Sequence, residues 1–284
     1  MQVAAIGRCS WGMLMAVLVL SGASALAGTE EDARRTEGRM TQPAIVLDIP
    51  GPWADRAAFL SDFADANDPA IVASGRGMST ADGHLHAAFD VLPHDPALAN
   101  AMWIGTGRSL DRNTMDKIAA HKAVVQVVVT DTGPGVEEHL RTFVDAVRKA
   151  GGLAVRVHDS GLSHDFKRWN ALLGAKMPTG LFQALVVQVP FRERGRLCSF
   201  GMVQFGLADG CIVDRGIDSE PAWVLFEFNM HLWQARPRLE TGHTFSRNMI
   251  GAQRYVLRRV EDRRYPVGHE YLNPYGVWEM DPVH

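Results

Sequence analysis

The sequence predicts an α+β protein built from antiparallel or mixed sheets with helices on one face. Of the 284 residues 46% are apolar and 21% are charged, a composition that excludes a disordered chain and a coiled coil. Segments with strand-like and helix-like patterns follow in the order β-α-β-β-α-β through the first half, the order of a ferredoxin-like unit. Two of these strands, 70–73 and 84–92, are joined without a helix, which favours antiparallel pairing over a doubly wound parallel sheet.

A looser copy of the same order begins at the expected strand 123–129 and runs to the expected strand 255–260. We therefore predict two ferredoxin-like units, at about 43–130 and 123–284, within an α+β domain that covers residues 43–284. A chain of this length can bury a sizeable core as one large domain or as two small ones.

The first 27 residues have the pattern of a secretory signal peptide. Arg8 precedes the apolar run 13–20, and the small residues 25–27 provide a cleavage site. The alternative is an uncleaved membrane anchor, but the apolar run is shorter than the ~20 residues that a spanning helix needs. We therefore predict a periplasmic or secreted protein, cleaved after Ala27, with residues 28–42 as a linker and no transmembrane segment after processing.

Local signals predict each element of the first half in turn. The apolar run 44–49 ends at Pro50-Gly51-Pro52, which suits a buried strand closed by a turn. Asp111 has the right chemistry to cap a helix, and the β-branched run 123–129 is typical of a strand. The predicted elements are strand 44–49, helix 55–66, strands 70–73 and 84–92, helix 111–121 and strand 123–129.

The clearest helix of the chain follows that strand. Its apolar residues stand at the i, i+4, i+7, i+8, i+11 spacing of one helical face: Val136, Leu140, Phe143, Val144 and Val147. Pro134 suits its first turn, and Arg148 and Lys149 complement the helix dipole at its end. The elements predicted beyond it are strand 153–157, helix 165–173, strands 181–189 and 198–205, a helix from 219–221 to about 235, and a last strand 255–260.

Two cysteines, Cys198 and Cys211, remain after removal of the signal peptide. An oxidising compartment permits a disulfide between them, worth about 3 kcal/mol for so short a loop. If residues 206–210 form the turn between two strands, however, the cysteines lie at unequal distances from it and do not face each other. Whether they form a disulfide therefore stays open, with two half-buried thiols as the alternative.

His84 and His86 are the candidate metal ligands. Residues i and i+2 of a strand project from the same face about 7 Å apart, so two imidazoles could reach one zinc ion if a third ligand came from elsewhere. His94 and Asp90 are near in sequence, but nothing in the pattern fixes their position. We favour a solvated strand face and keep the metal site as the alternative.

No catalytic residues are assigned. The triplets 131–133 and 159–161 follow apolar strands as the motifs of aspartic proteases do, but the first runs into a helix and both are interpreted as turns. The segment from His158 to Asp165 gathers reactive side chains at a strand end without a Gly-x-Ser-x-Gly elbow.

Charge argues against nucleic acid as a partner. The formal net charge is −3, and loss of one arginine with the signal peptide leaves 28 basic against 32 acidic residues, or −4. The arginines of the run 254–264 are interleaved with Tyr255 and Tyr265. Glu261 and Asp262 interrupt them, so we interpret the run as a solvated strand and hairpin.

Five short stretches stand out together: 101–103 (Ala-Met-Trp), 121–122 (His-Lys) with the strand that follows, 201–207 (Gly-Met-Val-Gln-Phe-Gly-Leu), 241–245 (Thr-Gly-His-Thr-Phe) and 273–278 (Asn-Pro-Tyr-Gly-Val-Trp). The first four resemble the bacterial family called domain of unknown function 4261, over roughly residues 44–280, and the fifth resembles an ending of related uncharacterised proteins. The resemblance implies an α+β fold and no catalytic residues. The export signal and His243, where the family leads us to expect an acidic residue, depart from it.

These observations predict an exported soluble protein that binds a protein or small-molecule partner in the cell envelope, without a cofactor. The alternative is a metal-dependent hydrolase that uses His84 and His86, with residues 158–165 nearby. A third possibility is a structural protein of the envelope.

Overall fold

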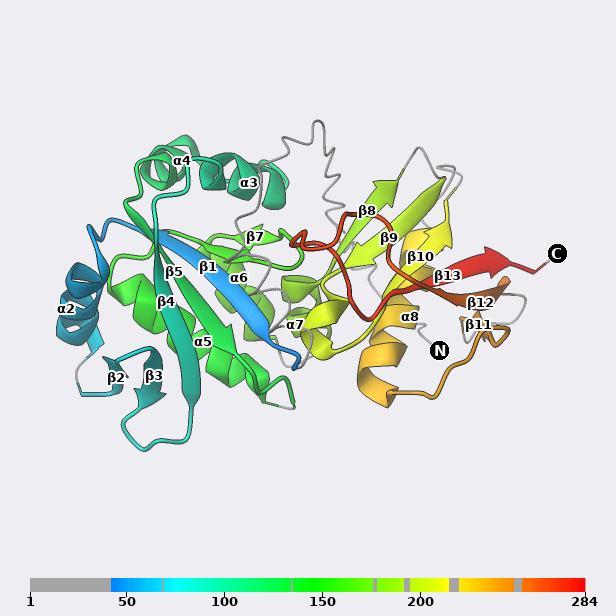
Figure 1. Cartoon of the computed structure of the whole chain (residues 1–284), viewed down its shortest axis with the longest axis horizontal. Helices are drawn as coiled ribbons and strands as arrows, with labels where there is room; N and C mark the ends of the chain where they lie inside the picture. Colours follow the sequence, from blue (N-terminus) through cyan, green and yellow to red (C-terminus); the bar gives the residue numbers. More distant parts are fainter. Residues whose placement is uncertain are drawn as a thin grey trace, which may run out of the picture.

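The computed structural model describes residues 42–67, 69–133, 135–175, 178–191, 195–214, 220–247 and 252–283. The predicted signal peptide and the linker up to residue 41 lie outside this part of the chain. Helices α2 to α8 accompany a sheet of seven strands and a sheet of six, which lie side by side (Figure 1). The predicted α+β class is confirmed.

The first sheet is antiparallel throughout, in the order β2-β3-β4-β5-β1-β6-β7. Its strands are β1 (Ile45–Gly51), β2 (Ile71–Ser74), β3 (Gly77–Thr80), β4 (His86–Pro93), β5 (Ala123–Val129), β6 (Val155–Val157) and β7 (Ser163–His164). The helices of this half are α2 (Arg56–Asn67), α3 (Leu98–Gly105), α4 (Arg112–Ala119), α5 (Val136–Lys149) and α6 (Phe166–Leu173).

A ferredoxin-like unit lies within this sheet. Elements β1, α2, β4, β5, α5 and β6 follow along the chain as β-α-β-β-α-β, and their strands stand in the order β4-β5-β1-β6. The hairpin β2–β3 and the helix pair α3–α4 are insertions into it. The second helix of the unit is therefore α5, whereas the sequence had suggested the helix at 111–121 for that place.

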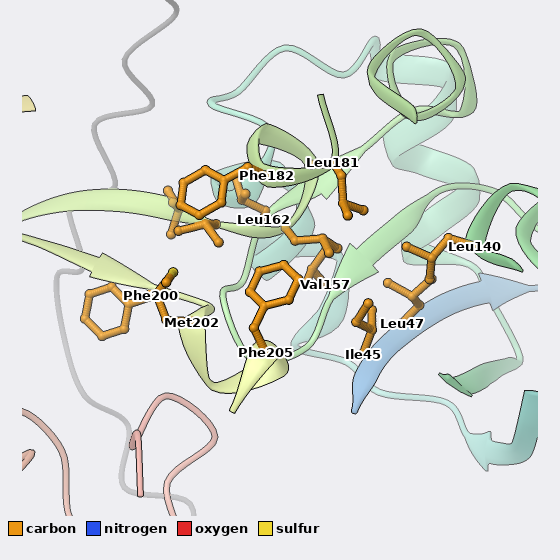
Figure 2. Packing of buried hydrophobic residues seen from close by; sticks show 14 of the residues in the cluster. Ile45, Leu47, Leu140, Val157, Leu162, Leu181, Phe182, Phe200, Met202 and Phe205 are labelled. Atoms are coloured by element: carbon orange, nitrogen blue, oxygen red, sulfur yellow. The ribbon is translucent and has the colours of Figure 1, made fainter. Parts of the chain in front are cut away.

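The two faces of β1 differ because side chains alternate along a strand. Ile45, Leu47 and Ile49 are fully buried, and Figure 2 shows Leu47 next to Leu140 of α5. The predicted apolar face of α5 is confirmed, since all five of its residues are buried. Asp48 points to the opposite face of the sheet, away from α5. The charged residues that contact Asp48 therefore lie on that face.

The second sheet has the order β11-β12-β13-β10-β9-β8, with β10 and β13 parallel and the other pairs antiparallel. Its strands are β8 (Val187–Phe191), β9 (Arg196–Phe200), β10 (Asp209–Val213), β11 (Thr244–Ser246), β12 (Arg254–Val260) and β13 (Val277–Pro282). Helix α8 (Glu220–Ala235) covers one face; a Cβ at Gly210 would lie 2.6 Å from Leu225. Three strands precede this helix, so the second half has its own order rather than that of the ferredoxin-like unit.

The strand predicted over 181–189 is wrong in its first part. Residues up to Leu185 belong to helix α7 (Pro178–Leu185), and β8 begins at Val187. Leu181, Phe182 and Leu185 are all buried. A short apolar run that is buried on every side does not distinguish a helix from a strand, so periodicity could not decide between them.

The strand predicted over 198–205 ends early, at Phe200. Gly201 has a φ of 109°, which few other residues adopt, and the 3-10 helix η2 (Met202–Phe205) follows it. The strand at 254–260 is not the last one either, because β13 follows it. Six further elements were not predicted, because each is short and lacks a strong period of its own: β3, α3, β7, β10, β11 and β13.

One buried apolar cluster runs through both sheets. Figure 2 shows Phe205 of η2 pointing toward Val157 of β6, so the connection between β9 and β10 packs against the first sheet. The two halves consequently share a core, and the segments that cross between them are fixed by it.

Candidate functional site

The loop of residues 261–276 joins β12 to β13 and crosses between the two sheets. In Figure 1 it leaves β12, reaches the neighbourhood of β7 and returns to β13. Its side chains enter two buried groups of charges, one on each sheet. We call these the first charge cluster (Asp48, Arg156, His158 and Glu270) and the second charge cluster (Asp209, Asp262 and Arg264).

The first charge cluster lies on the face of the seven-stranded sheet opposite α5. Asp48 and Arg156 are paired residues of β1 and β6, and Nη1 of Arg156 donates to Asp48 Oδ2 at 3.0 Å. Nη2 of Arg156 donates to both carboxylate oxygens of Glu270 at 3.0 Å and to the Tyr271 hydroxyl at 3.1 Å. A single buried guanidinium thus holds the loop of residues 261–276 to the sheet.

His158 completes this cluster. Its Nδ1 donates to Asp48 Oδ2 at 2.9 Å, and its Nε2 lies 3.9 Å from Oε2 of Glu270. Burial alone would raise the pKa of Asp48, but the charge and hydrogen bond of His158 and the charge of Arg156 outweigh it and hold that pKa well below its usual range. The Asp48 carboxylate is therefore ionised throughout the physiological range.

In the other groups of the first charge cluster, burial and neighbouring charges also shift the pKa values. Burial would lower the pKa of His158, but the neighbouring Asp48 carboxylate raises it above its ordinary value. Burial would raise the pKa of Glu270, yet Arg156 and His158 lower it. Burial raises the pKa of Tyr271 to about 12, so its hydroxyl stays protonated. The arrangement favours a charged imidazolium between two carboxylates.

The second charge cluster fixes the start of the same loop on the six-stranded sheet. Nη2 of Arg264 donates to Asp209 at 2.6 Å and to Asp262 at 2.8 Å, and its guanidinium lies 4.1 Å above the Phe200 ring. The Arg264 side chain is only 4% exposed. The backbone N–H of Asn273 donates to Asp262 at 2.8 Å, so the end of the loop is attached to the same cluster.

A hollow of about 600 Å³ opens next to the second charge cluster, on the face of the six-stranded sheet away from α8. Its apolar lining includes Phe191, Val260 and the half-cystines 198 and 211. Charged residues of both signs also line it, in pairs: Arg258 with Glu279, and Arg263 with Glu261. The lining can therefore contact a ligand that carries both apolar and charged groups.

Cys198 and Cys211 form a disulfide across β9 and β10, where they are directly paired residues. The geometric argument against the bridge was wrong because residues 206–210 are not the turn. Asp209 and Gly210 already belong to β10, and the connection from Gly201 to Ala208 contains η2. Strand ends at Phe200 and Asp209 place the two cysteines at equal distances from the connection.

His84 and His86 are both exposed. His86 is the first residue of β4, whereas His84 precedes the strand, with its backbone N–H donating to Asp82 at 3.1 Å. Within the described ranges no group of three or more His, Cys, Asp or Glu side chains is arranged to hold a metal ion. Among the described residues, none joins this pair as a third ligand.

The other motifs occupy turns and buried positions. Asp131 accepts from the backbone N–H of Gly133 at 3.0 Å, which is a turn, and Asp165 caps α6 by accepting from Arg168 N. Asp159 and Ser160 are buried, and Nε2 of His164 donates to the Ala184 carbonyl at 2.9 Å. Of the segment 158–165, His158 belongs to the first charge cluster, and the charge of the neighbouring Asp159 acts on it.

The basic run 254–264 is mixed in character. Arg258 and Arg263 are exposed and paired with carboxylates, as a solvated strand and hairpin would have them. Arg264 is instead buried in the second charge cluster, which the sequence did not indicate. Asp48 and Arg156 were also missed, although each is a charge inside an otherwise apolar strand, and a buried pair is the usual way to accommodate such charges.

No known family model, no curated protein and no solved structure matches this chain. None of the helices in the described part of the chain has the length and apolar character that crossing a bilayer requires.

Proposed function

We propose that this chain is an exported protein that binds a partner or ligand of the cell envelope, and that the hollow on the six-stranded sheet is its binding site. The observation that supports the proposal is the size and lining of this hollow. Its volume of about 600 Å³ lies within the range of sites that bind small molecules or the side chains of a peptide.

The lining of the hollow suits a ligand with both charged and apolar groups. Arg263 and Glu261 are 82% and 74% exposed, so their pair is weak and its members can pair with a ligand instead. The disulfide and the Phe191 and Val260 side chains supply apolar contact area beside them. Because strands β9 and β10 are covalently joined, this part of the lining is rigid before binding, which lowers the entropic cost of association.

Two independent features support export. The pattern of residues 1–27 is that of a signal peptide, and the disulfide between Cys198 and Cys211 is a bond that persists in oxidising compartments. N-terminal sequencing of the protein recovered from the cell envelope tests the proposal directly. We expect Gly28 as the first residue, whereas a protein that keeps Met1 contradicts export with cleavage.

Filling the hollow tests the binding site. Val260→Trp places a large ring in the hollow, and Val256→Trp places the same ring on the same face of β12 but outside the lining. Each mature protein is used to capture ligands from an envelope extract. We expect a component that the wild type and Val256→Trp retain and that Val260→Trp loses. Equal capture by all three would contradict the assignment of the hollow.

A further inference from the structure

The loop of residues 261–276 is held by two anchors that differ in their chemistry. Asp262, Arg264 and Asn273 tie its two ends to the six-stranded sheet, through an arginine and carboxylates. Its middle, residues 265–272, is tied to the seven-stranded sheet through Glu270 and Tyr271. Of the two charge clusters, the one on the seven-stranded sheet, the first charge cluster, contains a histidine, His158.

We infer that His158 is a pH-sensitive latch for residues 265–272. While its imidazole is protonated, it lies as a cation between Asp48 and Glu270 and holds this segment on the seven-stranded sheet. Loss of the proton leaves Arg156 as the one cation of the first charge cluster that faces Glu270, which loosens the segment, and the second charge cluster keeps the ends of the loop in place. The inference concerns the fold alone and does not depend on the proposed binding function.

The charges around His158 explain why one proton matters. The ionisable groups that face it are Asp48 from β1, Arg156 from β6, Asp159 beside it in the chain and Glu270 from the loop. With His158 protonated, two cations face three carboxylates; without the proton, one guanidinium faces three carboxylates. Of these three carboxylates, Glu270 is the one that belongs to the loop. Its side chain is 33% exposed, so it can move into water.

The direction of the response follows from the pKa of His158, which the Asp48 carboxylate raises despite burial. A histidine whose pKa is raised on folding stabilises the folded arrangement below its ordinary pKa near ~6.5, and this contribution is lost as the pH rises through the higher folded value. The latch is therefore closed near pH 6 and opens toward alkaline pH.

One group on the loop responds in the opposite sense. Nδ1 of His269 accepts from the backbone N–H of Tyr271 at 3.2 Å, and burial lowers the pKa of this imidazole. Protonation of His269 in acid would remove that acceptor. The segment is thus held best between the pH at which His269 takes up a proton and the higher pH at which His158 loses one.

Release would uncover aromatic surface. Tyr265 is stacked on His269 with ring centroids 4.3 Å apart, and Tyr271 lies 5.6 Å from Tyr265 and 6.2 Å from Phe200. Gly161, in the connection between β6 and β7, has a φ of +70°, and a Cβ there would lie 2.7 Å from the Tyr271 hydroxyl, so this connection leaves room for the Tyr271 side chain. Lifting residues 265–272 separates Tyr271 from Phe200 and from Gly161, and it leaves the second charge cluster intact.

Hydrogen exchange of the full mature protein tests the latch. Amide protection of residues 265–272 is measured from pH 6 to pH 9 by mass spectrometry and divided by the intrinsic exchange rate at each pH. We expect protection of this segment to fall by about tenfold for each unit by which the pKa of His158 is raised. Protection of β12 is expected to stay constant.

Two variants and a control make the result specific. His158→Asn keeps a donor toward Asp48 but carries no charge, so we expect low protection of residues 265–272 at every pH. Glu270→Gln removes the partner on the loop and is expected to weaken the pH dependence even if His158→Asn does not fold. His94→Asn, which alters a histidine outside the charge clusters, should keep the wild-type profile.

An NMR titration supplies an independent readout of the same proton. His158 is expected to titrate above the ordinary range in the wild type and to move toward it in Glu270→Gln. A wild-type protection profile that does not change between pH 6 and pH 9, or a folded His158→Asn protein that keeps the wild-type profile, overturns the latch.

Discussion

Arg156 and Glu270 are 114 residues apart in the chain, yet Nη2 of the arginine lies 3.0 Å from both carboxylate oxygens of the glutamate. The same guanidinium donates to Asp48 inside the sheet. Arg156 thus compensates a buried carboxylate of β1 and binds a loop that belongs to the other sheet.

Replacing Arg156 with methionine should destabilise the fold strongly. Arg156 and Asp48 are each about 5% exposed, so the substitution leaves a buried carboxylate without one of its two cationic partners, Arg156 and His158. Breaking one partner of a buried pair costs about 3–5 kcal/mol of unfolding free energy. Urea denaturation measures this loss.

Arg263→Met is the matched control, because Arg263 pairs with Glu261 at an exposed site. We expect a change within about 0.5 kcal/mol for it. Equal losses for the two arginine variants would show that the first charge cluster contributes no more than a surface ion pair.

Loss of the disulfide should cost about 3 kcal/mol, the chain-entropy value for a loop of about this length. The double variant Cys198→Ala with Cys211→Ala is compared with the wild type by urea denaturation, with and without a reducing agent. The reductant should lower the stability of the wild type and leave the variant unchanged. A wild type that does not respond to reduction would contradict the bridge.

Stability should fall in acid through His164. Burial lowers the pKa of His164 to about 4, and its Nε2 donates to the Ala184 carbonyl. Because the folded pKa lies below the ordinary value of ~6.5, the contribution is complete above pH 6.5 and is lost as the pH falls through about 4.

The measurement is the unfolding free energy of the wild type and of His164→Asn between pH 7 and pH 4. The variant should show a shallower decline, since asparagine cannot take up a proton there. An NMR titration midpoint of His164 near ~6.5 would argue against this explanation.

His84→Ala together with His86→Ala should change the unfolding free energy by less than about 0.5 kcal/mol, because both residues are exposed. We also expect no stoichiometric zinc in the purified wild type. Elemental analysis checks this point, and one equivalent of zinc that the double variant loses would instead favour a metal-dependent hydrolase.

The sequence alone predicted the elements whose signals are local. The β-branched run became β5, Asp111 caps α4 by accepting from Thr114 N, and the apolar face of α5 is buried as its spacing predicted. These signals act over a few residues, because capping and helical periodicity depend on neighbours in the chain. The position of the α5 face required no knowledge of the sheet it covers.

The tertiary structure decided the rest. The run around Leu181 is helical, Cys198 faces Cys211 because η2 fills the connection between their strands, and Glu270 reaches Arg156 because the loop of residues 261–276 crosses to the other sheet. Each outcome depends on contacts between segments far apart in the chain. Local propensity does not favour either alternative at these positions. One of them is selected in the assembled core, where apolar surface is buried and buried charges are paired.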